Sequence, residues 1–473
     1  MKKNKVLVIG IDGATFDLID PMIKSKKLPN ISKLVKTGIS APLNSTVPPM
    51  TAIAWPSFFT GVNPGKHGLF DFIQVDRATQ DIHINSYKDV KTLSLWDHCS
   101  RNGLKSVVIN VPVTFPPKGD RNTTVLSGML TPPGKHYCSN LKLEKVLDEK
   151  FGKYKLNYDY VKYVRELEGK DKYSKSIEWI WDKDRQICDI TKYLLTEQDP
   201  DLTITVFMGV DQSAHLVWNF RDKKHMLHSD FSKAVEDTYE KIDGYIGELV
   251  EKTSDRIVML MSDHGWGDLT HAVHANNVLH HLGLLQFKTS QGQGEQYKLN
   301  IVDWMDETDD TKPAGKKVTS KKKGVKSKMF KVTKQMLKRM GARKWIYYLP
   351  FNKKLYSFYL NMSDRSEADI KYEIDWENSS AWLSSPGTQS INLKPDLDNT
   401  DELIIKIKNE FMGLKCSTCG KRLIKNVFTR DELYWGPNKK AAPEIIIVPD
   451  GYESRVTGSQ PQIENVTDHY DIR

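Results

Sequence analysis

Short runs of apolar residues alternate along this chain with longer segments in which apolar residues recur at helical spacing. The runs lack the polar alternation of a half-exposed strand, which is typical of strands buried on both faces of a parallel sheet. The four clearest runs are 5–11 (KVLVIGI), 105–111 (KSVVINV), 202–208 (LTITVFM) and 256–261 (RIVMLM). A fifth run, 444–448 (EIIIV), is expected to return to the same sheet. The pattern predicts an α/β fold with a mostly parallel central sheet flanked by helices.

The same pattern divides the chain into five segments. Residues 1–135 and 201–300 carry the strand-like runs and are expected to form two parts of one core. Residues 136–200 are charged and helix-patterned, without a strand-like run, which predicts a helical cap inserted between these parts. A Lys-rich insertion at 301–345 follows, and 346–473 is expected to return to the core.

Positive charge is concentrated in one part of the insertion. Residues 311–344 contain 14 Lys and Arg and no Asp or Glu, so removing these charges from the net +9 leaves about −5 on the rest. Met329, Met336 and Met340 recur there at helical spacing, which predicts a basic amphipathic helix. Such a segment suits either a solvated insertion that packs on the protein or a contact with an anionic membrane surface. A nucleic-acid contact is disfavoured, because no aromatic platform or groove-reading motif accompanies the lysines.

The overall composition indicates a folded protein in a reducing compartment. Apolar residues make up 39% and charged residues of both signs 27%, which excludes global disorder. No apolar run approaches the ~18 residues of a transmembrane helix, and the stretch 6–11 is too short for a signal peptide. We therefore expect a cytoplasmic protein, with peripheral membrane association through the basic helix as an option.

The cysteines add one motif. Their number, five, does not suit a disulfide framework in a chain of this length. Cys416 and Cys419 form a Cys-x-x-Cys-Gly motif that could be half of a zinc ribbon. Because the sequence offers no second such motif or nearby His pair, the favoured interpretation is a turn that carries two thiols.

Acidic residues follow three of the predicted strands. Asp12, Asp211 and Asp263 each come within a few residues of a strand end, and two of them have a histidine partner, His215 and His264. The carboxyl ends of parallel strands meet at one edge of a sheet, which would bring these side chains together. Asp and His are ligands for zinc and similar divalent ions.

Each of these residues also has an ordinary interpretation. Asp12 alone could cap a turn before Gly13, and His215 alone could be a semi-buried histidine. Taken together, the five side chains predict a two-metal site of the kind that assists in-line displacement at phosphorus.

A hydroxyl residue completes the candidate chemistry. Thr51 follows Pro48-Pro49-Met50 in the Pro- and Gly-rich stretch 47–68, whose aromatic residues suit a core. Thr51 could cap a helix, but beside two cations it could be ionised and act as a nucleophile.

The order of these pieces resembles the type I phosphodiesterase/nucleotide pyrophosphatase family of the alkaline phosphatase superfamily. The resemblance rests on Asp12 after the first strand, Thr51 in a segment ending TGVNPGKHG (60–68), Asp211-x-x-x-His215 and Ser-Asp263-His264-Gly. It covers about 5–130 and 201–283.

The resemblance implies an alkaline-phosphatase-like fold with two divalent ions, zinc or manganese. By motif position, one ion would be bound by Asp12, Thr51, Asp263 and His264, and the other by Asp211 and His215. Thr51 would attack the phosphorus of a phosphate diester or pyrophosphate, and water would hydrolyse the phospho-threonine.

The family supplies a further ligand of the second ion from a late histidine. Here His469 is the only histidine after His281, so it is either that ligand or the chain stops short of the true one. Alternatives within the superfamily are hydrolysis of a phosphomonoester or sulfate ester, or a phosphomutase reaction. An alternative of another class is a non-catalytic protein that binds an anionic surface and carries a decayed metal site.

Overall fold

The computed structural model describes residues 5–75, 82–157, 159–253, 255–290, 371–384, 388–416, 419–451, 453–457 and 466–468. The Lys-rich segment 311–344 and His469 lie outside these ranges, so the proposed basic helix, its membrane contact and the late metal ligand stay predictions. The division into five segments also stays a prediction. Among the described helices, none combines the length and the apolar composition that spanning a membrane requires.

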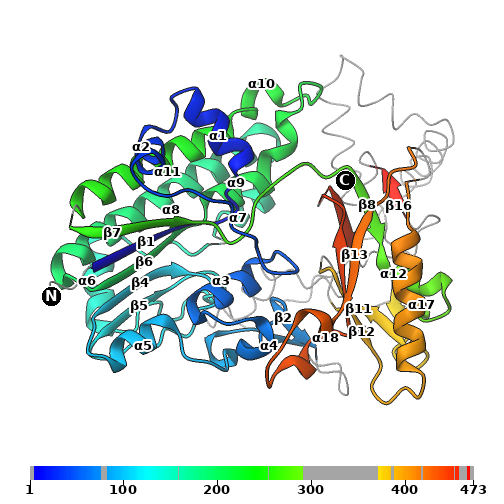
Figure 1. The fold of residues 1–473 in the computed structure, drawn as a ribbon. Helices are drawn as coiled ribbons and strands as arrows, with labels where there is room; N and C mark the ends of the chain where they lie inside the picture. Colours follow the sequence, from blue (N-terminus) through cyan, green and yellow to red (C-terminus); the bar gives the residue numbers. More distant parts are fainter. Residues whose placement is uncertain are drawn as a thin grey trace, which may run out of the picture.

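A five-stranded, fully parallel sheet lies at the centre of the larger part of the molecule (Figure 1). Its strands, in spatial order, are β5 (Thr123–Ser127), β4 (Ser106–Val111), β6 (Leu202–Phe207), β1 (Lys5–Ile11) and β7 (Arg256–Met261). The four clearest apolar runs are therefore strands of one parallel sheet, as predicted. β5 was not predicted.

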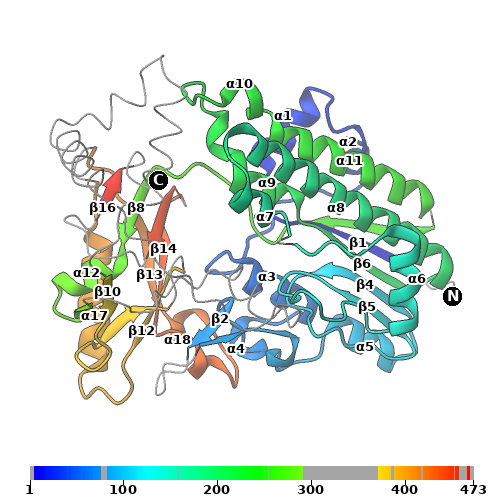
Figure 2. The same cartoon turned by 180° about the vertical axis from the view of Figure 1, so that it is seen from behind.

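Helices cover both faces of this sheet (Figures 1 and 2). One face is covered by α1 (Phe16–Lys24), α2 (Pro29–Thr37), α8 (Gly169–Gln198), α9 (Gly209–Val217) and α11 (Ala234–Lys252). The other is covered by α3 (Thr51–Thr60) and α5 (Leu95–Arg101). The fold class is thus the predicted α/β type with a parallel central sheet between helical layers.

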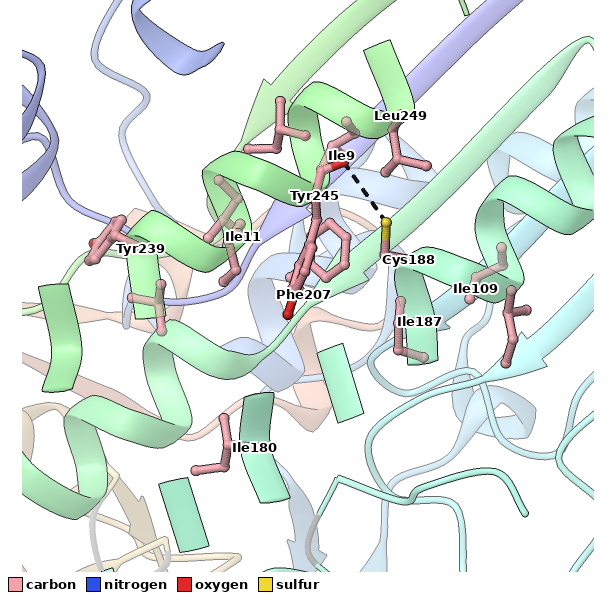
Figure 3. Packing of buried hydrophobic residues seen from close by; sticks show 14 of the residues in the cluster. Ile9, Ile11, Ile109, Ile180, Ile187, Cys188, Phe207, Tyr239, Tyr245 and Leu249 are labelled. Carbon is pink, nitrogen blue, oxygen red and sulfur yellow. Dashed lines mark hydrogen bonds between the residues drawn. The ribbon is translucent and has the colours of Figure 1, made fainter. Parts of the chain in front are cut away.

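Side-chain alternation along the strands builds a separate core on each face. Leu7, Ile9 and Ile11 of β1 pack under α8 and α11, where Figure 3 shows Ile9 and Ile11 among the core side chains. Val8, between them, packs on the opposite face with Trp55 of α3. Both faces of the strand are buried, which explains its continuous apolar sequence.

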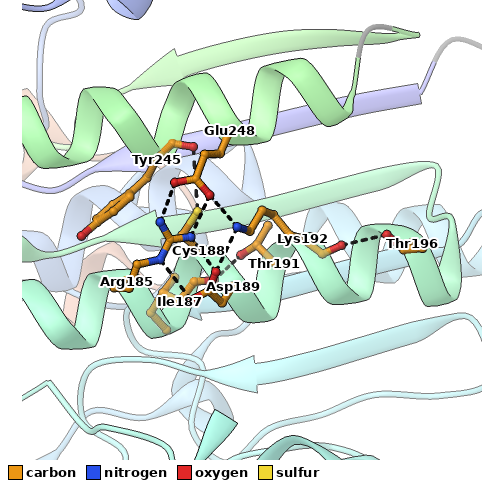
Figure 4. Close-up of polar contacts among 9 residues, drawn as sticks. All are labelled: Arg185, Ile187, Cys188, Asp189, Thr191, Lys192, Thr196, Tyr245 and Glu248. Carbon is orange, nitrogen blue, oxygen red and sulfur yellow. Dashed lines mark hydrogen bonds and ion pairs between the residues drawn. The ribbon is translucent and has the colours of Figure 1, made fainter. Parts of the chain in front are cut away.

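A cluster of charged side chains joins the two long helices over the first face (Figure 4). Arg185 of α8 donates to Glu248 of α11 from Nη2 over 2.9 Å and to Asp189 from Nε over 3.0 Å. Lys192 also pairs with Glu248. The hydrogen bond from Arg185 holds the pKa of Glu248 down at about 2, so this carboxylate is charged at neutral pH.

A smaller lobe contains an antiparallel sheet of β11 (Ala381–Leu383), β12 (Ser390–Leu393), β14 (Ile445–Pro449) and β13 (Ile424–Thr429), in that order. The run 444–448 therefore does not return to the central sheet, and that prediction is wrong. Ile445 and Ile447 pack in the core of the lobe, whereas Ile446 packs against Phe70 and Tyr434. Burial on two faces produces the same apolar run in either sheet, so the run could not identify its neighbours.

The remaining strands form smaller sheets. They are β2 (Ile73–Val75) with β3 (Ile82–Ile84), β9 (Phe287–Ser290) with β10 (Lys371–Ile374), and β15 (Ser454–Thr457), β8 (His271–His274) and β16 (Val466–Asp468) in that order. The remaining helices are α4 (Pro64–His67), α6 (Leu141–Phe151), α7 (Val161–Glu166), α10 (His228–Phe231), α12 (Ala275–His281), α17 (Thr400–Gly413) and α18 (Arg430–Leu433), with 3-10 turns η1 (Tyr87–Asp89), η2 (Trp218–Arg221) and η3 (Lys439–Ala441).

His67, the last residue of α4, is a structural residue that makes the fold sensitive to acid. Its Nδ1 accepts a hydrogen bond from Leu69 N (3.2 Å), and its Nε2 lies 3.0 Å from Ser57 Oγ, whose own proton goes to Ile53 O. The ring is therefore satisfied as a neutral imidazole. Burial lowers the pKa of His67 from 6.5 to about 4.

Because the unfolded chain takes up this proton first, the contribution of His67 to stability should fall as the pH drops from 6.5 towards 4 and stay constant above 6.5. The expected loss is about 3 kcal/mol, at about 1.4 kcal/mol per pKa unit. Urea unfolding across this range checks it, with His67→Gln as control. An identical pH dependence in both proteins would contradict the assignment.

Candidate active site

Three neighbouring strands of the central sheet, β6, β1 and β7, bring the predicted acidic residues to one edge. Asp12 directly follows β1, and Asp263 follows β7 by two residues. Asp211 lies in the first turn of α9, just after β6, and its backbone N–H donates to Asp12 O over 3.2 Å. Adjacent parallel strands thus place all three aspartates at their carboxyl ends, as the sequence predicted.

Asp12, Asp263 and His264 form the tightest part of the site. His264 Nε2 lies 3.3 Å from Asp263 Oδ2 and 3.6 Å from Asp12 Oδ1. One ligand atom from each of the three lies within 4.8 Å of the other two. Both aspartates are buried. Two carboxylates and an imidazole therefore converge on one point inside the protein.

The buried carboxylates are only half satisfied by hydrogen bonds. Asp12 Oδ2 accepts from Trp55 Nε1 over 2.8 Å, and Asp263 Oδ1 accepts from Gly13 N over 3.3 Å. Among the described residues, none donates a hydrogen bond to Asp12 Oδ1 or Asp263 Oδ2, the two oxygens that face His264. Unpartnered buried oxygens of this kind are costly unless a cation satisfies them.

The pKa shifts of Asp12, Asp263 and His264 also indicate that the buried carboxylates require a positive charge. Burial, followed by the charges of Asp263 and Asp211, raises the pKa of Asp12 well above its usual value. Burial also raises the pKa of Asp263. Burial alone would lower the pKa of His264, but the carboxylates of Asp263 and Asp12 raise it to about 9. A protonated His264 therefore supplies the positive charge that these carboxylates require.

His264 presents the nitrogen that a metal ligand needs. Its Nδ1 lies 3.0 Å from Gly265 O, a carbonyl that can only accept, so Nδ1 carries a proton. In the neutral ring Nε2 then has the lone pair, and Nε2 faces Asp12, Asp263 and the hydroxyl of Thr51. A backbone carbonyl that fixes the ring in this way is the usual second partner of a metal-bound histidine.

Thr51 lies at the first position of α3, with its Oγ1 3.1 Å from His264 Nε2. The residue is buried and helix α3 begins without a side-chain cap. The positive end of the helix therefore faces the same point as the hydroxyl. The geometry fits the predicted position of a nucleophile beside a cation.

Asp211 and His215 form a separate pair next to this group. His215 Nε2 lies 3.5 Å from Asp211 Oδ1, one helical turn away on α9. The His215 side chain is 64% exposed, and its ring packs edge-on against Trp266. The structure thus brings together Asp12, Thr51, Asp263 and His264, with Asp211 and His215 beside them.

The donor set and its unpartnered oxygens fit a divalent ion. Carboxylate oxygens and an imidazole nitrogen suit zinc, and they also suit manganese. Among the described residues of this sheet edge, Asp12, Asp263 and His264 form a group whose ligand atoms lie close enough together to hold one ion.

Trp55 packs in the core, as expected for the aromatic residues of 47–68, and it also contacts the candidate site. Its indole packs against Gly10, where an added Cβ would lie 2.2 Å from the ring, and its Nε1 fixes Asp12. A glycine inside a buried strand often marks such a close approach. In the sequence, Gly10 inside a strand and a tryptophan one helical turn after Thr51 were the two features that could have indicated this contact.

Gly13 allows Asp12 and Asp211 to approach each other. It has φ +72°, and a Cβ at this position would lie 3.0 Å from Asp211 Cβ. Gly134 has the same φ, but among the described residues no heavy atom lies within 4 Å of its added Cβ. An alanine substitution would therefore strain the backbone at both glycines, but only at Gly13 would the new Cβ also press on Asp211.

Gly134→Ala should cost about 1 kcal/mol of stability and leave metal binding unchanged. Gly13→Ala should cost more and weaken Zn²⁺ binding at least about tenfold, because it displaces Asp211, whose proposed ligand role rests on its position. Urea unfolding and zinc titration check this pair. Equal zinc affinities in the two variants would contradict the role of the close approach.

Comparison with known proteins agrees with the resemblance seen in the sequence. The sequence model of the type I phosphodiesterase / nucleotide pyrophosphatase family matches residues 6–349. No curated protein matches the chain.

Several solved structures are similar. Phosphonoacetate hydrolase from Sinorhizobium meliloti 1021, in complex with phosphonoformate, is 12% identical, with 98% of this chain and 85% of that chain covered and a TM-score of 0.49. An inactive murine ectonucleotide pyrophosphatase/phosphodiesterase 5 in complex with AMP is 13% identical, with 99% and 84% covered and a TM-score of 0.42. The human form of the latter protein is 12% identical, with the same coverage and a TM-score of 0.43.

Proposed function

Because this chain belongs to the type I phosphodiesterase/nucleotide pyrophosphatase family, a family of phosphoric ester hydrolases in the alkaline phosphatase superfamily, we propose that it hydrolyses a phosphate diester or pyrophosphate through Thr51. One observation carries the proposal. The Thr51 hydroxyl lies 3.1 Å from His264 Nε2, at the point where two buried carboxylate oxygens lack hydrogen bonds.

Two divalent ions, zinc or manganese, would be held at this site. Asp12, Thr51, Asp263 and His264 would bind the first ion, and Asp211 and His215 the second. A further ligand of the second ion would be either His469 or a residue beyond this sequence. When bound, such ions lower the pKa of a coordinated hydroxyl and stabilise negative charge on the leaving oxygen.

The chain's own residues determine the course of the reaction. Thr51 Oγ forms a bond to phosphorus while the bond to the leaving oxygen breaks, and the hydroxyl proton passes to solvent. The N-terminal end of α3 favours the negative phosphoryl oxygens there. Water then attacks the phospho-threonine, releases the second product and restores the Thr51 hydroxyl.

The surrounding cavity favours a diester over a monoester. It measures about 2260 Å³, and its lining includes Phe72, Met129 and Trp218, which suit an apolar or aromatic group on the substrate. Among the described lining residues, permanent positive charge comes from Arg256 and Arg455. Arg256 begins β7, at the end of the strand opposite Asp263, and is paired with Asp199. Arg455 remains as a positive charge of the lining, so the preference for a diester rests on the apolar side chains.

The test measures the hydrolysis rates of a diester, bis(p-nitrophenyl) phosphate, of a monoester, p-nitrophenyl phosphate, and of a nucleotide pyrophosphate. Each is assayed with EDTA or with added Zn²⁺ or Mn²⁺. We expect metal-dependent hydrolysis of the diester, faster than that of the monoester. Preferred hydrolysis of the monoester would favour the phosphatase alternative. The absence of any hydrolysis of phosphoric diesters and pyrophosphates in the presence of metal would overturn the proposal.

A further inference from the structure

A second group of metal-ligand side chains lies in the smaller lobe. It consists of His271 in β8 and of Cys416 and Cys419 in the hairpin before β13. One ligand atom from each residue lies within 4.8 Å of the other two. The group shares no residue with the candidate active site. The sequence alone could not suggest it, because His271 and Cys416 are 145 positions apart (416 − 271).

The hairpin is folded so that the two sulfur atoms lie on the same side. The backbone N–H of Cys419 donates to Cys416 Sγ over 3.4 Å, and Gly420 N donates to Cys416 O over 2.9 Å. Cys416 N donates to Lys421 O over 2.9 Å, so the turn is closed by backbone bonds on both sides. Gly420 has φ +71°, a conformation that favours glycine. An N–H group that points at sulfur stabilises a thiolate, the form that binds metals.

His271 is held in the tautomer that a ligand requires. Its Nδ1 lies 2.8 Å from Thr270 Oγ1, and this hydroxyl donates its own proton to Glu453 O over 3.2 Å. Thr270 Oγ1 can therefore only accept from Nδ1–H, which leaves the lone pair of the neutral ring on Nε2. A hydroxyl or carbonyl partner on the far nitrogen is typical of metal-bound histidines.

We infer that His271, Cys416 and Cys419 bind a thiophilic divalent ion, of which zinc is the best match. Two thiolates and an imidazole are a common zinc ligand set, and Cys-x-x-Cys is its usual spacing. In a tetrahedral site with Zn–S bonds of about 2.3 Å, the sulfurs lie about 3.8 Å apart. The tetrahedral separation of nitrogen and sulfur is about 3.5 Å, so the observed separations, up to 4.8 Å, need a contraction of about 1.3 Å at most.

The coordination is open on one side. Cys416 and His271 are buried, whereas Cys419 is exposed. Among the described residues these three form the group, so in the proposed site a water molecule can serve as the fourth ligand on the side of Cys419. Binding releases the two thiol protons. The ion would then crosslink the hairpin of residues 415–422 to β8, the strand that the chain enters soon after the Asp263–His264 turn.

Cobalt provides a test that does not depend on the active site. The reduced, metal-free full chain is titrated with Co²⁺ and followed by absorption. Only a thiolate ligand produces a sulfur-to-cobalt charge-transfer band, so Co²⁺ bound by the carboxylates and histidines of the active site does not contribute. We expect this band in the wild-type protein, and we expect added Zn²⁺ to abolish it.

Variants show which residues bind the cobalt ion that gives the charge-transfer band. It should be absent from C416S/C419S, and His271→Ala should weaken Co²⁺ binding at least about tenfold. It should persist in Cys99→Ser, a cysteine outside the group, and in Asp263→Asn, so that a failure of the proposed activity leaves this result unaffected. Circular dichroism checks that each variant is folded.

Two results would overturn the inference. One is the absence of the band from the reduced wild-type protein, a measurement that needs no variant. The other is a band of unchanged strength and affinity in C416S/C419S or in His271→Ala.

Discussion

Replacing Thr51 with alanine is expected to lower kcat for a phosphate diester by about a thousandfold or more. The hydroxyl is the only group of Thr51 that can form the bond to phosphorus, and removal of a covalent nucleophile has effects of this size. The fold should survive, because alanine suits the first turn of a helix and the Thr51 Oγ1 contact given by the structure is with His264.

The controls separate chemistry from structure. Thr51→Ser keeps the hydroxyl and should keep much of the activity that the alanine variant loses. Both variants should unfold at the wild-type urea concentration in the absence of metal. Turnover by Thr51→Ala close to that of the wild type would rule out Thr51 as the nucleophile.

Asp12→Asn should have opposite effects on function and on metal-free stability. Turnover should fall at least about a hundredfold, because removing a direct ligand costs more than removing the partner of one. The metal-free fold should become more stable. Burial and the nearby carboxylates raise the pKa of Asp12, so above its unfolded pKa the charged group opposes folding.

A neutral amide removes this penalty and can still accept the hydrogen bond from Trp55. We expect a higher free energy of unfolding than that of the wild type in urea with EDTA at neutral pH, because the charged carboxylate that opposes folding is gone. With Zn²⁺ the order should reverse, because only the wild type gains stability from the ion. Asp20→Asn, the same change at an exposed position of α1 outside the first turn, should alter neither quantity. A metal-free Asp12→Asn protein less stable than the wild type would contradict this reading of the site.

The parallel sheet could be predicted where a strand has a nearly continuous apolar run. β1, β4 and β6 have such runs because both of their faces are largely buried. β7 has one too, although it lies at the edge of the sheet and exposes Ile257 and Met259. β5 was missed because it has only five residues and begins with two polar ones, Thr123 and Thr124, so it contains no apolar run. β14 was recognised as a strand but assigned to the wrong sheet. Its apolar residues face the core of the smaller lobe on one side and a cluster with Phe70 and Tyr434 on the other.

The candidate site could be predicted because parallel strands deliver their carboxyl ends to one edge. Asp12, Asp211 and Asp263 each follow a recognisable strand, so topology alone implied that they meet. Trp55 was missed because its role depends on one indole hydrogen bond, which an apolar stretch does not reveal. The group of His271, Cys416 and Cys419 depends on contacts between distant segments of the smaller lobe. No strand pattern in the sequence indicates that these segments meet, in contrast to the parallel strands of the central sheet.

The most direct test of the central claim is the stereochemical course at phosphorus. A phosphorothioate diester of defined configuration would be hydrolysed by the metal-loaded protein in isotopically labelled water, and the configuration of the product determined. Attack by Thr51 and then by water inverts the configuration at phosphorus twice, so net retention is expected. Net inversion would show that water attacks the substrate directly, and it would contradict a phospho-threonine intermediate at Thr51.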